Sequence, residues 1–278
     1  MADDNFDYTR FELGFVLLAF FSKFVLHTDY YIFASMITSV ALVIKFFSFR
    51  FLRYPLFAMI FYVMNWYPLH EYTQIRAAIA ISILFLSVEY IFQKRLIIFV
   101  GLSILAAFFH SSVIMVSGIL FLAYQVRTRS LLAGFIIVCG TASVAPFLFV
   151  LGLPYLTQLN PLLPAYLENV GAENLPNFLS GANILTVLFL VFVAFSGTLN
   201  NERRRTFFLI SCAGLAVFVG FSGIPVLAHR LKEALLVFMT FIAFEYPVNW
   251  RTVPQTLAAT ALSAWVLYSS VNDLFGAH

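Results

Sequence analysis

Residues 184–193 read Ile184-Leu185-Thr186-Val187-Leu188-Phe189-Leu190-Val191-Phe192-Val193, a stretch without a single charge. Strands of a membrane barrel alternate apolar and polar residues over about ten positions, whereas this stretch is apolar on every side. It therefore predicts a helix. Apolar runs of the about 17–25 residues that a helix needs to cross a hydrocarbon core recur from one end of the chain to the other.

The composition of the chain indicates that lipid is its solvent. Of its 278 residues, 62% are hydrophobic and only 10% are charged, and the mean hydropathy is +0.93. A soluble domain carries roughly a quarter charged residues. Because hydrocarbon offers the backbone no water, each span must satisfy its own hydrogen bonds, as helices do. The sequence predicts an all-α, polytopic transmembrane helical bundle of about 10–11 spans, with residues 1–278 as a single integral membrane domain.

The predicted spans follow the apolar runs. Their limits are 30–47, 54–69, 77–92, 96–109, 113–126, 131–153, 181–199, 206–223, 234–247 and 255–271. Residues 11–26 leave two alternatives open, a short span that starts in the cytoplasm or a re-entrant helix whose two ends both face outward. The N-terminus lacks the pattern of a cleavable signal peptide.

Basic residues between the predicted spans set the expected orientation, because cytoplasmic loops collect Lys and Arg. The clusters that share one face are Lys45, Arg50 and Arg53; Lys94 and Arg95; Arg127 and Arg129; Arg203, Arg204 and Arg205; and Arg251. The outer face then receives loops around residues 69–76, 110–112, 154–180 and 224–233. These short clusters are topology signals, and the net charge of +3 gives no reason to expect a nucleic-acid partner.

Ionisable side chains at membrane depth are candidate functional residues, because each costs at least about 2.5–3.5 kcal/mol at a helix centre. On the predicted outer face these are Glu71, Arg76, His110, His229, Arg230, Lys232 and Glu233. Arg76 has a planar fork that suits phosphate oxygens, and the small residues Ala78 and Ser82 let a neighbouring helix approach closely. The alternative for Arg76 is an arginine that extends to the membrane interface.

His110 and the group around Arg230 each have two interpretations. His110 lies at the outer turn between two short predicted helices, as a base or as a capping and packing histidine. Pro225 breaks the preceding span, so His229 and Arg230 fall in the first turns of the next helix, against the preference of the helix dipole. An anionic ligand would explain these cations, and the alternative is a charge network with Glu233.

Other signals in the sequence are weaker. The predicted loop 154–180 contains Tyr166 and Glu168, which suit sugar binding but are equally typical of any interfacial loop. The chain has no phosphate-binding Gly-Lys-Ser loop, no metal-ligand cluster and no nucleophile elbow. Cys139 and Cys212 lie inside apolar runs, and we expect them to be packing residues rather than disulfide partners.

Several short motifs resemble, in order and spacing, those of one known family. They are Phe11-Glu12-Leu13-Gly14-Phe15, Gln74-Ile75-Arg76-Ala77-Ala78-Ile79-Ala80, Gln93-Lys94-Arg95, Phe109-His110-Ser111-Ser112-Val113-Ile114 and Leu227-Ala228-His229-Arg230-Leu231. The series resembles the EpsG family, which belongs to the Wzy-like polysaccharide polymerases, and it covers nearly the whole chain. The first motif is similar to a glutamate-glycine element of that family.

The resemblance implies a GT-C-like glycosyltransferase of the bacterial inner (cytoplasmic) membrane that needs neither metal nor cofactor. It would join the reducing-end sugar of one polyprenyl-diphosphate-linked oligosaccharide to a hydroxyl of the next unit. The implied partners are this lipid-linked oligosaccharide, membrane lipid and, as a candidate, a chain-length regulator protein. The implied catalytic residues are His110, Glu71 and Arg76, and the implied substrate-binding residues are Arg76, Arg230, His229, Lys232, Gln74 and Tyr166. His110 and Arg230 are expected to share one outer-face cavity.

Two other functions stay open. A transporter or flippase would move a lipid-linked glycan without breaking bonds, and it would need a central polar pathway and often internal repeats, neither of which is evident. A membrane O-acyltransferase would take a cytosolic donor, which favours polar chemistry on the inner face.

Overall fold

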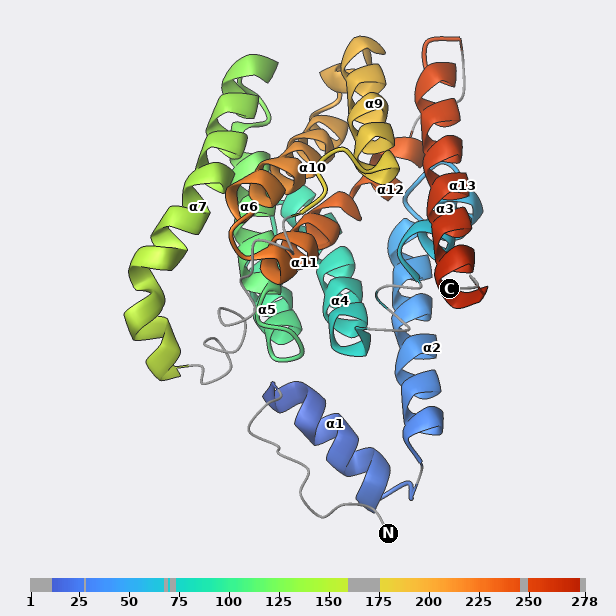
Figure 1. The fold of residues 1–278 in the computed structure, drawn as a ribbon, viewed down its shortest axis with the longest axis vertical. Coiled ribbons are helices and arrows are strands. Elements are labelled where there is room, and N and C mark those ends of the chain that lie inside the picture. The colour runs from blue at the N-terminus through green and yellow to red at the C-terminus, as the bar shows by residue number, and fades with distance from the viewer. Residues whose placement is uncertain are drawn as a thin grey trace. The chain divides into compact units, whose positions relative to one another are not determined.

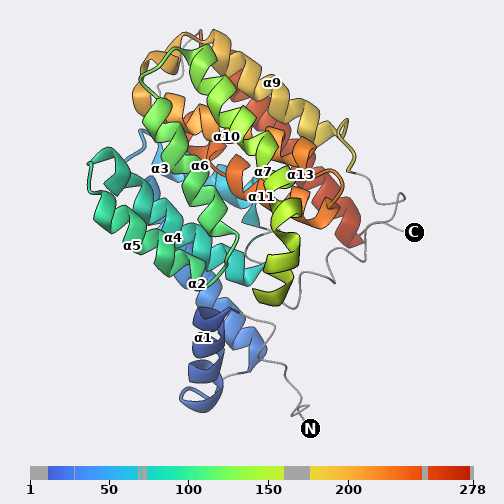
Figure 2. The same cartoon turned by 90° about the vertical axis from the view of Figure 1, so that its left-hand side faces the viewer.

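The computed structural model of the chain describes residues 12–27, 29–67, 70, 74–159, 176–245 and 250–275. Within these ranges all regular structure is helical, which confirms the all-α prediction for the described residues (Figures 1 and 2). The elements are α1 (Leu13–Phe24), α2 (Tyr30–Phe49), α3 (Pro55–Asn65), α4 (Ile75–Phe92), α5 (Leu96–Ala107), α6 (Val113–Val126), α7 (Leu131–Leu159), α9 (Gly181–Phe195), a short 3₁₀ helix (Thr198–Asn200), α10 (Glu202–Gly220), α11 (Pro225–Leu236), α12 (Met239–Phe244) and α13 (Val253–Phe275).

The chain divides into two compact units, and each is described by itself. Unit 1 comprises Met1–Ser48 and Leu69–Met115, and unit 2 comprises Phe49–Pro68 and Val116–His278. Unit 1 therefore holds α1, nearly all of α2, α4 and α5, whereas unit 2 holds α3, most of α6, and α7 to α13. That both units form one integral membrane domain stays a prediction.

In unit 1, α4 packs along α5 and crosses α2 at a point of close approach. The hydroxyl of Ser82 lies 3.0 Å from the carbonyl oxygen of Ala41 in α2 and 2.6 Å from that of Ala78 in its own helix. All three residues are fully buried. Small side chains let the two backbones approach closely enough for this contact, so the prediction made for Ala78 and Ser82 is confirmed.

In unit 2, α10 is the central helix. It packs against α7, α9, α11 and α12, while α13 packs against α9 and α3. The helix starts where the side chain of Asn201 accepts the backbone N–H groups of Arg203, at 2.9 Å, and Arg204, at 3.1 Å. Such a cap satisfies amides that have no partner inside the helix, and it fixes the beginning of α10 at Glu202 rather than at the predicted residue 206.

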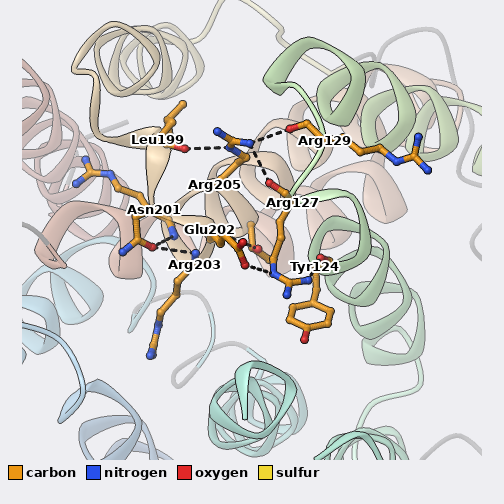
Figure 3. A network of polar contacts seen from close by, with 10 residues as sticks. Tyr124, Arg127, Arg129, Leu199, Asn201, Glu202, Arg203 and Arg205 are labelled. Carbon is orange, nitrogen blue, oxygen red and sulfur yellow. Dashed lines mark hydrogen bonds and ion pairs between the residues drawn. The ribbon is translucent and has the colours of Figure 1, made fainter. Parts of the chain in front are cut away.

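Two of the predicted basic clusters meet at one end of unit 2 (Figure 3). Arg205 donates through Nε to the carbonyl oxygen of Leu199 at 2.9 Å, and through Nη1 to those of Arg127 at 2.9 Å and Arg129 at 2.8 Å. Arg127 in turn pairs with the Glu202 carboxylate at 2.8 Å. The clusters at 127–129 and 203–205 therefore lie on the same side of unit 2, as the predicted topology requires.

The structure corrects the prediction that the basic residues sit in loops. The side chains of Lys45 and Arg204 are 0% exposed. The ammonium of Lys45 donates to the carbonyl oxygen of Ala78 at 2.9 Å, and Arg204 donates to Oε1 of Gln255 at 2.6 Å. Long basic side chains at a helix end can fold back into the protein when a polar acceptor is available, so these two residues do not report a cytoplasmic loop.

Several helix limits also differ from the prediction. Residues 154–159 belong to α7 rather than to a loop, and residues 225–233 belong to α11, which starts with Pro225 at the position where a missing N–H costs nothing. The predicted span 234–247 is wrong, because α11 ends at Leu236 and a separate short helix, α12, follows. The predicted turn around His110 is confirmed between α5 and α6.

By length and composition, α2 and α4 are the described helices that could cross a membrane, while α1, α3, α5, α6 and α9 are apolar but shorter. The number of spans therefore stays a prediction. Large apolar side chains are exposed in both units, with Ile97 at 90%, Phe195 at 86% and Tyr31 at 79%. Exposed apolar surface on this scale suits contact with lipid rather than water.

The described part of residues 11–26 forms a helix too short for a crossing. With 12 residues, α1 is about 18 Å long at 1.5 Å per residue, against the about 30 Å of a hydrocarbon core. In Figure 1, α1 and the first part of α2 form a hairpin that extends away from α4 and α5. Because α5 has the same length, both alternatives for residues 11–26 stay predictions.

The close approach of α2 and α4 gives a prediction for stability. Replacing the fully buried Ala41 by Leu should force the two helices apart and destabilise unit 1 by about 1–3 kcal/mol, the usual cost of overpacking. Thermal unfolding in detergent should show a lower Tm. Val40→Leu, at a neighbouring position that is 48% exposed, is the matched control and should leave the Tm unchanged. Equal Tm values for both variants would contradict the tight crossing.

Candidate functional site

Three segments that are distant in the sequence bring charged side chains together in unit 1. Glu12 immediately precedes α1, Arg76 is the second residue of α4, and His110 lies in the turn between α5 and α6. All three side chains are partly buried, with 20%, 27% and 15% of their surfaces exposed. The structure thus brings together two of the residues predicted from the sequence and adds a third, Glu12.

Each oxygen of the Glu12 carboxylate contacts a different partner. Nη1 of Arg76 donates to Oε2 at 2.5 Å, and Nδ1 of His110 lies 3.2 Å from Oε1. The backbone N–H of Ser111 also points to Oε1, at 3.4 Å. Charge-assisted hydrogen bonds of this kind are stronger than neutral ones and fix geometry. One carboxylate therefore holds the arginine and the histidine side by side.

The position of Glu12 depends on a backbone contact of Gly14. The N–H of Gly14 donates to the carbonyl oxygen of Phe108 at 2.9 Å. A Cβ atom at position 14 would lie 2.8 Å from that oxygen, closer than real side chains come. Only glycine permits this approach, so the spacing Glu12-Leu13-Gly14 places the carboxylate next to the turn that carries His110. This is the structural basis of the glutamate-glycine element.

The surroundings of Glu12 keep it ionised. Burial alone would raise its pKa, but the hydrogen bond with His110 and the positive charge of Arg76 outweigh burial and lower the pKa of Glu12 from 4.5 to about 2. Opposite charges and hydrogen bonds to the ionised form act in this direction. At neutral pH the carboxylate is therefore an acceptor only, and its contacts must be made by donors.

A second histidine lies near this cluster. His70, just before α4, is 2% exposed. Burial, with the nearby positive charges of Lys45 and His110, lowers the pKa of His70 from 6.5 to about 3. It is therefore neutral at physiological pH. His70 was not among the residues predicted from the sequence, because an isolated histidine in a short segment carries no pattern.

The remaining candidates in unit 2 form a separate group on α11. The ammonium of Lys232 donates to Oδ1 of Asn183 in α9 at 3.2 Å and lies 4.2 Å from the ring centroid of Phe218 in α10. The ring of His229 packs edge to face on Phe218 with centroids 4.9 Å apart. Cations over aromatic faces are stabilised without an ionic partner, so Lys232 is well accommodated by the protein itself.

Arg230 is half-buried in unit 2, and the charges of Arg230 and Lys232 both act on Glu233. Whether these cations bind an anionic ligand or form a charge network with Glu233 stays a prediction. Gln74 is the N-cap residue of α4, and its N–H donates to the carbonyl oxygen of His70 at 3.2 Å. Glu71 and Tyr166 lie outside the described residues.

No grouping of three or more His, Cys, Asp or Glu side chains that could hold a metal occurs in the described ranges. The arrangement in unit 1 suits two kinds of chemistry instead. A histidine whose Nδ1 faces a carboxylate presents its other ring nitrogen as a base, and a partly exposed arginine at the start of a helix suits an anion. A side chain that could accept a proton and one that could bind an anion are thus held by the same carboxylate.

An all-helical chain with exposed apolar helices and a half-buried cluster of carboxylate, guanidinium and imidazole is typical of membrane proteins that act on polar ligands at a lipid boundary. This chain belongs to the EpsG family, which it matches over residues 2–273. The family suggests a membrane protein of polysaccharide biosynthesis and, in general, a polymerase of the glycosyltransferase kind. No curated protein and no solved structure matches the chain.

The contact between Gly14 and Phe108 gives a prediction for the docking of α1. In Gly14→Ala the added methyl group should push the start of α1 off Phe108, because a Cβ atom there would lie 2.8 Å from the carbonyl oxygen. Hydrogen exchange of the backbone around residues 12–16 should become faster, and the Tm in detergent should fall.

The control is Gly101→Ala in α5 of the same unit, where an added Cβ meets nothing within 4 Å. It should leave the exchange of residues 12–16 unchanged, with a gain of up to about 0.5–1 kcal/mol from the helix propensity of alanine. Unchanged exchange in both variants would show that α1 does not depend on this contact.

Proposed function

We propose that the chain is a GT-C-like membrane glycosyltransferase that polymerises polyprenyl-diphosphate-linked oligosaccharide units on the outer face of the bacterial inner membrane. The observation that carries the proposal is the cluster of Glu12, Arg76 and His110, in which a base and an anion ligand share one carboxylate. Membership of the EpsG family supports the substrate class. The chemistry proposed needs no metal.

The proposed reaction uses His110 and Arg76 on the same bond. Nε2 of His110 removes the proton from an acceptor hydroxyl, and the hydroxyl oxygen forms a new bond to the anomeric carbon of the donor sugar. The bond between that carbon and the diphosphate oxygen breaks, and its electron pair leaves with polyprenyl diphosphate. Arg76 stabilises the negative charge that develops there. Products are a glycan lengthened by one unit and the lipid diphosphate.

Other residues keep the roles predicted for them as proposals. Glu71 is the second candidate base, and Gln74, Tyr166, His229, Arg230 and Lys232 are candidate substrate ligands. His110 belongs to unit 1 and Arg230 to unit 2, so their convergence on one cavity stays a prediction. A multi-pass location in the inner membrane, an undecaprenyl carrier and a chain-length regulator as partner belong to the same proposal.

The function is tested with purified protein and lipid-linked repeat units, separating the products by length. Wild-type protein should yield a ladder of longer glycans, and His110→Ala should reduce it by about 10²–10⁴-fold, the usual contribution of a general base. Arg76→Lys should also lose activity, because lysine keeps the charge but cannot form paired hydrogen bonds to phosphate.

Arg95→Lys is the matched control, since Arg95 is exposed in the same unit and lies outside the cluster. It should keep full activity. Full ladders from both His110→Ala and Arg76→Lys would remove this site from the proposal. If wild-type protein transfers the lipid-linked units across vesicle membranes and makes no ladder, a flippase is the better assignment.

The proposed orientation has its own test in intact cells. A single cysteine at Ser112 should react with a membrane-impermeant thiol reagent, and one at Glu202 should not. Ser112 follows the outer-face turn, whereas Glu202 lies with the basic residues at the end of unit 2 shown in Figure 3. The reverse labelling pattern would invert the topology.

A further inference from the structure

We propose that Glu12 is the positioning residue of this site, and that its carboxylate holds His110 in the tautomer that leaves Nε2 as the base while it fixes Arg76 beside it. The inference rests on the proposed function and extends it to a residue that the candidate site predicted from the sequence did not include. Glu12 itself touches neither substrate nor reacting atoms in this scheme.

The two carboxylate oxygens of Glu12 bind different partners. Oε1 faces Nδ1 of His110 at 3.2 Å and the backbone N–H of Ser111 at 3.4 Å, so a carboxylate that cannot donate requires the ring proton to be on Nδ1. Oε2 accepts from Arg76 at 2.5 Å. Because both oxygens belong to one rigid group, the distance between the base and the anion ligand is fixed as well.

Contacts of the neighbouring residues Gly14 and Phe15 hold Glu12 in place independently of its charge. The N–H of Gly14 is bonded to Phe108 at 2.9 Å, and the ring of Phe15 packs edge to face on Phe33 of α2 with centroids 5.6 Å apart. These two contacts lie within three residues of Glu12 and involve no ionisable group. A change of the carboxylate to an amide should therefore leave α1 docked, which separates positioning from folding.

The charge of Glu12 matters most while the proton is being transferred. As His110 takes the proton from the acceptor hydroxyl, the ring becomes cationic, and an adjacent carboxylate stabilises that form and keeps the ring oriented. The pKa of Glu12, at about 2, keeps the carboxylate ionised throughout. An amide in its place has no charge and can present its NH₂ group to the ring, which favours the wrong tautomer.

The pH dependence of the site involves groups from several elements. Glu12 at the start of α1 faces His110, Arg76 of α4 shares the same carboxylate, and His110 acts through its charge on His70 just before α4. Lys45 of α2 acts on His70. The pKa of His70, lowered to about 3, keeps this histidine neutral over the range of the assay. Glu12→Gln thus removes the charge that faces both His110 and Arg76 and leaves the other groups named here as they are.

The experiment compares wild-type protein, Glu12→Gln and Glu89→Gln in the polymerisation assay from pH 5 to 9. Glu89 belongs to α4 of the same unit and accepts a bond from Gln93 at 3.5 Å, so Glu89→Gln makes the same chemical change away from the cluster. We expect Glu12→Gln to lower kcat by about 10²–10⁴-fold with a much smaller effect on KM. The pH profile of Glu12→Gln should also differ from that of wild type, because the carboxylate that faces the ring is gone. Glu89→Gln should match wild type.

Failure of the proposed function and failure of the positioning role of Glu12 give different results in this experiment. If wild-type protein makes no ladder, the proposed function fails and the role of Glu12 falls with it. If wild type and Glu89→Gln make ladders and Glu12→Gln does so at the same rate with the same pH profile, the positioning role alone is wrong. Hydrogen exchange around residues 12–16 is measured in parallel. A loss of activity with faster exchange there and an unmoved pH profile would assign Glu12 a purely structural role and overturn the inference.

Discussion

In a hydrocarbon environment, the polar groups of a chain must find hydrogen-bond partners within the protein, and this constraint shapes both units. The ammonium of Lys45 donates a hydrogen bond to the carbonyl oxygen of Ala78, and the guanidinium of Arg204 donates one to the side-chain amide oxygen of Gln255. Lys232 donates to the side chain of Asn183 and lies over the ring of Phe218. Each contact ties two helices together. Because lipid offers no competing hydrogen bonds, such contacts specify which helices pack. The cluster at Glu12 obeys the same rule with charged partners on both sides.

The sequence predicted the helices well where the apolar pattern is continuous and poorly where polar groups turn inward. The limits of α2, α5 and α6 follow from apolar runs bounded by charges. Lys45 and Arg204 were misread because a rule that counts basic residues takes no account of where a long side chain ends. The helix start after Pro225 was predicted from that proline, whereas the end of α11 at Leu236 was missed because the apolar run continues through it into α12.

Two of the three residues of the candidate site, Arg76 and His110, were predicted from the sequence, and Glu12 was not. Arg76 and His110 stand out because ionisable residues are rare in apolar surroundings. Glu12 lies 64 residues from Arg76 and 98 from His110, and no local pattern links them. Gly14, two residues after Glu12, could have pointed to this position, because a glycine at the start of an apolar helix indicates a close contact with another backbone segment. That contact is with Phe108, next to the turn that carries His110.

An anionic substrate beside a carboxylate raises the question of whether Glu12 would become protonated and lose its hold on His110. Raising the pKa of Glu12 from about 2 to neutral pH would take about 7 kcal/mol, since one pKa unit corresponds to about 1.4 kcal/mol. Each of the two negative charges of a sugar-linked lipid diphosphate would contribute about 3 kcal/mol at about 5 Å and the effective dielectric of a protein site, and Arg76, which would bind the diphosphate, offsets part of this sum. The diphosphate would therefore weaken the bond between Glu12 and Arg76, which it shares, before it protonated Glu12. In the proposed reaction His110 then keeps an ionised partner, and Arg76 would be the group whose contacts are redistributed when the donor binds and the lipid diphosphate leaves.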